Sequence, residues 1–200
     1  MEVGWLIAIF PLAYLLGSVP SSVWLGKATR GIDLRAHGSG NAGATNAFRV
    51  LGKPIGIAVL LLDAGKGYLA VQLSQLQHEI LPDSESWMIL RICLAVMAVA
   101  GHIFPLFAGF RGGKGVATIA GAGLALHPYA ALAAMGIYLL VFIISKISAL
   151  GSIAAVLSYP VWVIWVFHTG SPSLRIFSIL IPVMVIITHR NNIRKLAGRT

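Results

Sequence analysis

The sequence predicts an all-α integral membrane protein with seven transmembrane helices, and two observations, its composition and its apolar runs, lead to that prediction. Of its 200 residues, 58% are hydrophobic and only 10% are charged, whereas a soluble domain carries about 25% charged residues. The apolar residues gather in runs long enough to cross about 30 Å of hydrocarbon. Because no polar stretch is long enough to build a second core, we expect one transmembrane domain over residues 1–200.

The first apolar run is preceded by Glu2 and followed by Lys27 and Arg30. This order is the reverse of that in a cleaved signal peptide, so we expect a retained first span over residues 4–25 with its N-terminus outside. Further runs of spanning length lie at residues 54–76, 87–109, 149–168 and 174–189.

The stretch 116–145 fits either one overlong helix or two short ones. A break at His127-Pro128 is favoured, because the residue before a proline avoids helical geometry. Residues 116–126 are then only eleven positions, about 16 Å of helix, too short to cross the bilayer alone. We therefore expect a recessed or re-entrant helix, or one that borrows the glycine-rich turn before it.

Basic residues favour seven spans over six. With six spans, Lys146 and the basic tail from Arg190 onward would lie outside, against the positive-inside rule. With seven spans they lie on the cytoplasmic side together with the other basic loops, and the C-terminus is cytoplasmic. The net charge of +9 then comes from loops at a membrane surface and not from a nucleic-acid-binding face.

A polar stretch, Gly38-Ser-Gly-Asn-Ala-Gly-Ala-Thr-Asn46 followed by Arg49, stands between two apolar runs; we call it the first loop motif. Its glycines allow the backbone to wrap an anion closely, and its side chains supply donors. It contains Gly-x-Gly-x-x-Gly, but no strand precedes it and Asp63 falls inside an apolar run, so a dinucleotide site is not indicated. An anion or polyol site is favoured over a plain flexible loop. If a helix begins near Thr45, Asn46 and Arg49 share a face.

The second loop motif is Phe110-Arg-Gly-Gly-Lys-Gly115. It is not a Walker A loop, because Ala108 stands where the first glycine belongs and Gly115 follows Lys114. Backbone amides at a helix start, with Lys114 and Arg111, suit a phosphate, although the two basic residues alone would also serve as a positive-inside signal. Our central hypothesis is that the two motifs are halves of one site for phosphate-bearing molecules.

Other polar residues lie within or beside the apolar runs. Asp63 and Lys66 are three apart and opposite in sign, which favours a structural ion pair, with a substrate role for Lys66 as the alternative. His102 suits either a ligand contact or a structural hydrogen bond. His189 and Asn192 share a helix face.

Ser148 and Ser152, with Ser145 and Lys146, could add hydroxyl donors to the site or simply cap a helix. Closely spaced His, Cys and carboxylate ligands are absent, so we expect no metal. No acid stands near a cytoplasmic histidine in a recognisable sequence pattern, which argues against a Ser-His-Asp triad.

Three stretches together resemble one family. They are the first loop motif with Arg49, the segment from Gly101-His-Ile-Phe-Pro105 through Thr118, and His189-Arg-Asn-Asn-Ile193. Their order and spacing resemble the bacterial acyl-phosphate-dependent glycerol-3-phosphate acyltransferases (PlsY type), over essentially the whole chain. Two departures stand out: the family commonly closes its third motif with Gly-x-Glu where this sequence has Gly198-Arg199-Thr200, and Ala149 replaces a common serine.

The resemblance implies a seven-span, N-outside protein of the bacterial inner membrane with its active site facing the cytoplasm. The expected reaction transfers a fatty acyl group from acyl phosphate to the 1-hydroxyl of sn-glycerol 3-phosphate. It yields lysophosphatidic acid and phosphate, the first acylation of phospholipid synthesis. We expect no cofactor and no nucleic-acid partner, contact with membrane lipids, and a functional link to an enzyme that forms acyl phosphate.

Residue roles follow by motif. The resemblance assigns phosphate-bearing ligands to the first motif and the glycerol-3-phosphate phosphate loop to the second, and it makes the third necessary for activity. The expected catalytic residues are His189, Asn192, Ser39 and Arg49. The expected substrate-binding residues are Gly40, Asn41, Thr45, Asn46, His102, Gly112, Gly113, Lys114, Gly115, Ser148 and Ser152.

Acyl phosphate carries a good leaving group, so the reaction needs no protein nucleophile. Positioning of the hydroxyl against the acyl carbonyl, with fixed hydrogen-bond donors, is sufficient for catalysis, and direct transfer is favoured over a covalent intermediate. The base is either a histidine or the substrate's own phosphate. An organic-phosphate transporter is the alternative function. It is disfavoured because the outer halves of the runs are apolar apart from Asp63 and Lys66, and because internal repeats are not seen. A lipid phosphotransferase would require an acidic metal-binding motif, and the sequence contains none.

Overall fold

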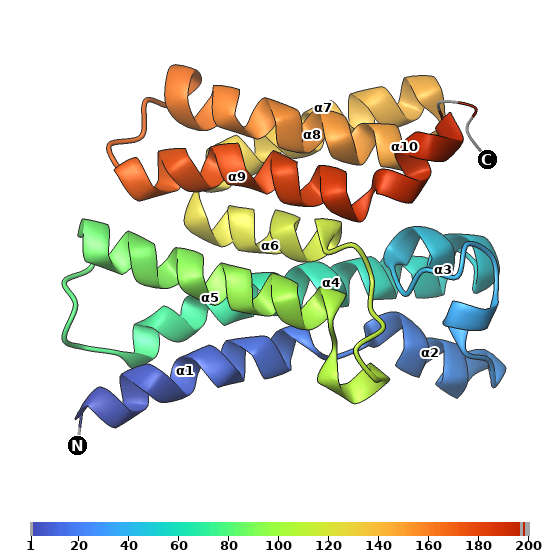
Figure 1. The fold of residues 1–200 in the computed structure, drawn as a ribbon, viewed down its shortest axis with the longest axis horizontal. Coiled ribbons are helices and arrows are strands. Elements are labelled where there is room, and N and C mark those ends of the chain that lie inside the picture. The colour runs from blue at the N-terminus through green and yellow to red at the C-terminus, as the bar shows by residue number, and fades with distance from the viewer. Residues whose placement is uncertain (1, 197, 199–200) are drawn as a thin grey trace. The chain divides into compact units, whose positions relative to one another are not determined.

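The computed structural model describes residues 2–196 and Gly198, and for residues 2–7 and Leu196 it describes the backbone alone. The described residues form helices and turns and contain no strand (Figure 1). By its internal contacts the chain divides into two compact units, one ending at Leu126 and the other beginning at His127. One domain over residues 1–200 stays a prediction, and the close of the third motif, Arg199-Thr200, lies outside the described residues.

The first unit is built around α4, which packs against α1, α3, α5 and α6. Figure 1 shows α1, α4 and α5 running alongside one another. Its elements are α1 (Glu2–Gly17), α2 (Ser21–Arg30), η1 (Leu34–Ala36), α3 (Ala44–Val50), α4 (Lys53–Gln72), η2 (Leu73–Leu76), α5 (Glu85–Ile103), η3 (Leu106–Ala108) and α6 (Val116–Leu126).

The second unit is a set of apolar helices in which α8 packs against both α7 and α9. Between α8 and α9 the chain forms a π-helical turn shortly after Pro160. Proline has no backbone N–H, so Pro160 interrupts the series of α-helical hydrogen bonds at this point. The elements are α7 (Pro128–Ser145), α8 (Ser148–Val161), η4 (Trp162–Val166), α9 (Pro172–Thr188) and α10 (Arg190–Leu196).

Within the described residues, 4 helices are long and apolar enough to cross a membrane, or 5 if the bent pair α1–α2 forms one span. The apolar helices α6 and α9 are shorter. These spans establish an all-helical, multi-pass membrane protein. The count of seven spans and the N-outside orientation stay predictions.

Prolines set the helix breaks. The predicted break at His127-Pro128 is confirmed: α6 has 11 residues and ends at Leu126, and the His127 ring accepts a hydrogen bond from the Ala130 N–H of α7 at 3.2 Å. The first span predicted over residues 4–25 is bent, and its being a single span stays a prediction. Its helix stops at Gly17, and α2 leaves at 41°, because Val19 precedes Pro20 and so avoids helical geometry.

Glycines let the helices of the first unit approach closely. A Cβ atom at Gly67 would overlap the carbonyl of Thr118, and one at Gly121 would overlap the carbonyl of Ala64, so α4 and α6 touch backbone to backbone. Gly17 and Gly101 do the same for α1 and α5. Such small-residue contacts hold helices together in lipid, where hydrophobic burial drives no association.

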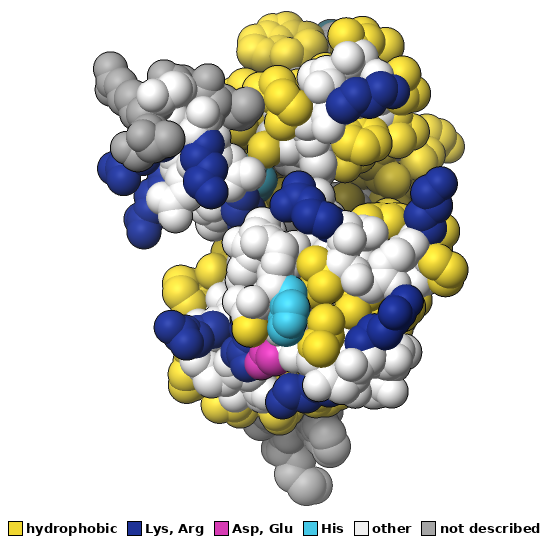
Figure 2. Space-filling model, turned by 90° about the vertical axis from the view of Figure 1, so that its right-hand side faces the viewer, with side chains coloured by type: hydrophobic (Ala, Val, Ile, Leu, Met, Phe, Trp, Pro, Cys, Tyr) yellow, Lys and Arg dark blue, Asp and Glu magenta, His cyan; other side chains and the backbone are white. Residues whose placement is uncertain are grey.

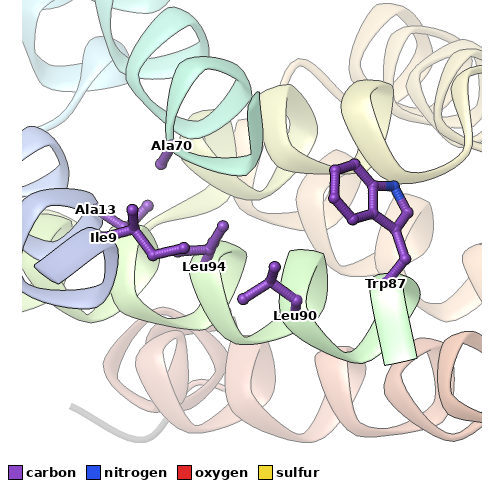
Figure 3. Close-up of a cluster of buried hydrophobic side chains, with 7 residues drawn as sticks. Ile9, Ala13, Ala70, Trp87, Leu90 and Leu94 are labelled. Atoms are coloured by element: carbon purple, nitrogen blue, oxygen red, sulfur yellow. The ribbon is translucent and has the colours of Figure 1, made fainter. Parts of the chain in front are cut away.

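A buried apolar cluster holds α1, α4 and α5 together near the ends that lie away from the two loop motifs (Figure 3). Its buried members are Ile9, Ala13, Ala70, Trp87, Leu90, Leu94 and Ala98. A second cluster, formed by Leu34, Ala47, Leu51 and Val59, fixes η1 and α3 onto α4. The first loop motif is therefore anchored on both sides by packed helices.

The backbone contact between α4 and α6 predicts a cost for the smallest possible side chain. Gly121→Ala should destabilise the protein by about 1–3 kcal/mol, since the overlapping atom of Ala64 belongs to rigid backbone. Gly65→Ala is the matched control on α4, because open space surrounds its Cβ position. Thermal unfolding in detergent should give a lower midpoint for Gly121→Ala alone; equal midpoints for the two variants would contradict the packing.

Candidate functional site

The first loop motif needs glycine at two positions. Gly38 and Gly40 have φ of +62° and +72°, a left-handed conformation that other residues adopt only with strain. Gly38 also lies against the side chain of Asn46, where a Cβ atom would overlap the amide oxygen. The motif is thus a tightly wound loop with a fixed shape.

Asn46 braces this loop from inside. Its side chain is 1% exposed, and its Oδ1 accepts a hydrogen bond from the Ser39 N–H at 2.9 Å. Its Nδ2 donates to the carbonyls of Leu34 at 3.2 Å and His37 at 2.9 Å. These atoms are therefore engaged in shaping the loop, and the expected substrate contact of Asn46 stays a prediction.

The helix expected near Thr45 begins at Ala44. Asn46 and Arg49, predicted to share a face of it, differ in burial: Asn46 points into the loop and Arg49 is exposed. Ser39, Gly40 and Thr45 are exposed as well, and Asn41 is half-buried.

Arg35 joins the two loop motifs, and the sequence did not single it out. Its guanidinium pairs with Asp33 at 2.7 Å and donates to the carbonyl of Ala108, in the turn before the second motif, at 2.6 Å. The hydrogen bonds from the Arg35 side chain and backbone lower the pKa of Asp33 to about 2, and Asp33 raises the pKa of Arg35. The pair stays charged at neutral pH, so the link persists.

The second loop motif folds back onto the end of α5. The N–H groups of Gly112 and Gly113 donate to the carbonyls of Ile103 at 3.1 Å and His102 at 3.2 Å, which satisfies carbonyls that the helix end leaves without partners. A Cβ atom at either glycine would overlap His102. Only glycine permits this contact.

Beneath the motifs lies a buried polar network. Asp63 and Lys66 form the expected ion pair, with Oδ1 and Nζ 2.9 Å apart and side chains 2% and 7% exposed. Lys66 Nζ also donates to the Val19 carbonyl at 2.8 Å, and Ser21 Oγ donates to Asp63 Oδ1 at 3.0 Å. The pair therefore pins the break between α1 and α2 to α4.

His102 stands beside this network. Its Nδ1 lies 3.7 Å from Asp63 Oδ1 and has no hydrogen-bond partner among the described residues. The sequence shows no pattern that joins this histidine to an acid, but Asp63 lies beside it in the structure. The two residues come from α4 and α5, and no sequence spacing reveals their proximity.

A small pocket in the first unit is lined by both motifs and by this network. Gly113 packs against His102 on one side and approaches the Ala42 carbonyl of the first motif on the other. The lining residues are Val19, Pro20, Ser21, Ala42, Asp63, Lys66, His102, Pro105, Gly112 and Gly113. The two motifs therefore lie next to each other in the first unit, and their role as halves of one site for phosphate-bearing molecules stays a prediction.

The rim around this pocket is basic. Figure 2 shows Lys and Arg side chains over the face that includes the loops at α2 and α3, where acidic side chains are scarce. Residues 104–115 carry no acid, and the acid between residues 26 and 53 is Asp33, which Arg35 neutralises. Lys114 is half-buried and Arg111 is exposed. Anions are therefore attracted to the rim.

In the second unit, His189 stands between α9 and α10 and is 3% exposed. Its Nδ1 lies 2.9 Å from the Val185 carbonyl, and a carbonyl only accepts, so Nδ1 carries the hydrogen and the lone pair of the neutral ring is on Nε2. Asn192, half-buried, follows one turn later on α10.

The two candidate serines belong to the same unit. Ser148 Oγ lies 3.0 Å from the Tyr138 hydroxyl, and Ser152 Oγ donates to the Ser148 carbonyl at 2.9 Å. Ser145 Oγ accepts from the Ile147 N–H at 3.1 Å in the turn before α8, and no side chain caps the start of α8 at Ile147.

Residues 7–199 match the family model for glycerol-3-phosphate acyltransferase. The chain belongs to this family. A relative from Chlorobaculum tepidum is 40% identical over 97% of this chain and 94% of its own length. One from Thermosynechococcus vestitus is 41% identical over 94% of this chain and 90% of its own. Both carry the name glycerol-3-phosphate acyltransferase.

Solved structures agree. The chain is similar to crystal structures of PlsY (YgiH), an integral membrane glycerol 3-phosphate acyltransferase, at 36% identity over 97% of this chain and 93% of that one. The TM-score is 0.84 for its glycerol 3-phosphate form and 0.82 for its lysophosphatidic acid form. The family is thus one of membrane acyltransferases, and acylation of glycerol 3-phosphate places it in phospholipid synthesis.

The buried ion pair predicts a non-additive pattern of stability. Asp63→Asn or Lys66→Met alone should cost about 3–5 kcal/mol, because each leaves the other charge buried without its partner. The double variant should recover much of that loss, since no net charge then remains. Unfolding midpoints of the four proteins in detergent measure the coupling; a double variant as unstable as the sum of the single ones would refute it.

Proposed function

We propose that this protein transfers a fatty acyl group from acyl phosphate to the 1-hydroxyl of sn-glycerol 3-phosphate, releasing lysophosphatidic acid and phosphate. The observation that supports it most is the union of the two loop motifs over one pocket, through Arg35 on Ala108 and Gly113 beside Ala42. A basic rim above a pocket whose lining includes Asp63, Lys66 and His102 suits molecules that carry phosphate at one end and hydroxyls at the other.

The proposed reaction requires from the protein mainly that it positions the two substrates against each other. The hydroxyl oxygen attacks the acyl carbonyl carbon, the bond from that carbon to the phosphate oxygen breaks, and the hydroxyl proton passes to a base. Acyl phosphate is a mixed anhydride with a good leaving group. Holding the hydroxyl oxygen about 3–3.5 Å from the acyl carbonyl carbon, with fixed hydrogen-bond donors around the transition state, therefore accounts for the rate enhancement. We favour direct transfer without an acyl-enzyme, and neither a cofactor nor a metal is required.

The first unit supplies the phosphate-binding groups in this proposal. Arg49, Ser39 and Thr45 are exposed on the first motif, where their side chains can reach a phosphate, with Gly40 and Asn41 shaping the same loop. In the second motif the backbone at Gly112, Gly113 and Gly115 and the ammonium of Lys114 would hold the other phosphate.

His189 and Asn192 match the third motif, and we propose them as catalytic residues, with Ser148 and Ser152 as residues that bind substrate through their hydroxyls. The tautomer of His189 is set by its hydrogen bond to Val185, which leaves Nε2 as the basic atom. The base is then either this nitrogen or a phosphate oxygen of the substrate.

We propose further that the site faces the cytoplasm from the inner membrane of a bacterium, in a seven-span, N-outside topology. The two ends of the first unit differ in charge. The loop end carries Lys27, Arg30, Arg49, Lys53 and Arg111, whereas the opposite end carries the acids Glu79, Asp83 and Glu85 with Arg91. The positive-inside rule supports a cytoplasmic loop end. An enzyme that makes acyl phosphate must act beforehand.

Donor choice tests the proposed reaction. Purified protein in detergent is given glycerol 3-phosphate with palmitoyl phosphate, palmitoyl-CoA or palmitoyl-acyl-carrier protein in separate assays. Lysophosphatidic acid should form from palmitoyl phosphate alone, and its absence there would refute the proposal. Without acceptor, labelled phosphate should not exchange into palmitoyl phosphate; exchange would show a covalent acyl-enzyme.

The role of His189 is tested by its removal. His189→Ala should lower kcat by about 10²–10⁴-fold if the imidazole is the general base, and the loss should exceed that of His78→Ala. His78 is an exposed histidine with no assigned role and serves as the matched control. Turnover by His189→Ala at the wild-type rate would assign the base to the substrate phosphate instead.

A further inference from the structure

The chain turns sharply where it enters the second loop motif. Gly109 and Phe110 both have a positive φ, of +62° and +58°, and open space surrounds the Cβ position of Gly109. Because glycine adopts several backbone conformations at little cost, packing at Gly109 does not fix the direction of the chain. Hydrogen bonds hold the turn instead. Two of them are local, from the N–H groups of Ala108 and Phe110 to the Pro105 carbonyl at 3.2 Å and 2.9 Å.

Arg35 ties this turn to a distant part of the chain. Its Nη1 donates to the Ala108 carbonyl at 2.6 Å. The guanidinium is itself held on a second edge, since Nε donates to Asp33 Oδ1 at 3.0 Å and Nη2 donates to Asp33 Oδ2 at 2.7 Å. A guanidinium is planar and rigid, so this two-point pairing fixes the position of Nη1. We call Asp33, Arg35 and the Ala108 carbonyl the clamp.

The first loop motif has a separate support. Asn46 is 1% exposed and bonds to three backbone groups within residues 34–39. These bonds do not involve the side chain of Arg35. Loss of that side chain should therefore leave the first motif in place and release the turn at Ala108, which leads into the second motif.

We propose that Asp33 and Arg35 are positioning residues that hold the second loop motif in the conformation that binds phosphate. This inference rests on the proposed function, in which the second motif binds the phosphate of glycerol 3-phosphate. Arg35 acts on the turn, and Asp33 acts by orienting Arg35. Without the clamp, the second motif spends part of its time in conformations that do not bind, and the apparent dissociation constant rises as the binding conformation becomes less populated.

Direct contact between Arg35 and the substrate phosphate is the competing interpretation, and Asp33→Asn separates the two. The asparagine keeps an oxygen that accepts the Arg35 backbone N–H, as Asp33 Oδ1 does at 3.0 Å, but it removes the charge that orients the guanidinium. If Arg35 acts by position, this variant binds glycerol 3-phosphate more weakly. If the guanidinium binds the phosphate itself, its release from Asp33 strengthens binding.

Calorimetric titration of the full-length protein in detergent with glycerol 3-phosphate tests the clamp without an acyl donor. The dissociation constant should rise about 10-fold in Arg35→Met, which loses a hydrogen bond from a charged donor, and about 3-fold in Asp33→Asn. The double variant should match Arg35→Met, because Asp33 acts only through Arg35. The titration stoichiometry gives the fraction of protein able to bind, so partial unfolding is not mistaken for weaker binding.

Two further variants control for charge and for folding. Arg30→Met removes one positive charge from an exposed side chain at the end of α2, and its dissociation constant should stay within about twofold of wild type. Arg35→Lys keeps the charge but lacks the fork that holds Asp33 and the Ala108 carbonyl together, so its value should lie between those of wild type and Arg35→Met. If Arg35→Met does not fold, Arg35→Lys and Asp33→Asn carry the test.

Three results would overturn the inference: wild-type affinity in the Arg35 variants, tighter binding by Asp33→Asn, or additive effects in the double variant. Acylation assays supply a second readout, in which the KM for glycerol 3-phosphate should rise in Arg35→Met while the KM for palmitoyl phosphate changes less. A wild-type protein that binds glycerol 3-phosphate but forms no lysophosphatidic acid from palmitoyl phosphate would refute the proposed function alone, and the titrations would still decide whether the clamp positions the loop.

Discussion

The ion pair of Asp63 and Lys66 is the interaction on which the first unit depends. A lone charge within a membrane-embedded bundle is costly, and two charges are tolerated only when each is fully paired. Here the pair draws its remaining partners, the Val19 carbonyl and the Ser21 hydroxyl, from the point where Pro20 interrupts the first helix. The break supplies the polar groups that the charges need, and the charges keep the break in place.

Close helix packing extends this arrangement to the loops. Gly67 follows Lys66 directly and lets α6 approach α4, so the start of α6 and the second loop motif lie near the pair. Gly101 precedes His102 and does the same between α5 and α1. The small residues and the charged ones are therefore neighbours along the chain for one reason: a polar site within lipid needs backbones close enough to enclose it.

Features governed by nearby residues were predictable from the sequence. The break before Pro128, the 11-residue α6, the helix starting near Thr45 and the pairing of Asp63 with Lys66 each follow from rules that span a few positions. The same proline rule applied to Val19-Pro20 would have found the first break, but the long apolar run masked it. Contacts such as Arg35 with Ala108 and Asp63 with His102 join residues 73 and 39 positions apart. The spacing of these residues along the sequence does not reveal such contacts.

The arrangement of charge explains how one small site can treat two ends of a substrate differently. The rim is basic because its loops carry cations with a single neutralised acid, and the floor is neutral because its acid and base are joined. A phosphate is therefore drawn to the rim, whereas the floor, which has no net charge, has no comparable attraction for it. In the proposed reaction this difference orients glycerol 3-phosphate with its phosphate at the rim. Orientation of this kind is the main contribution that a protein can make when the leaving group is already good.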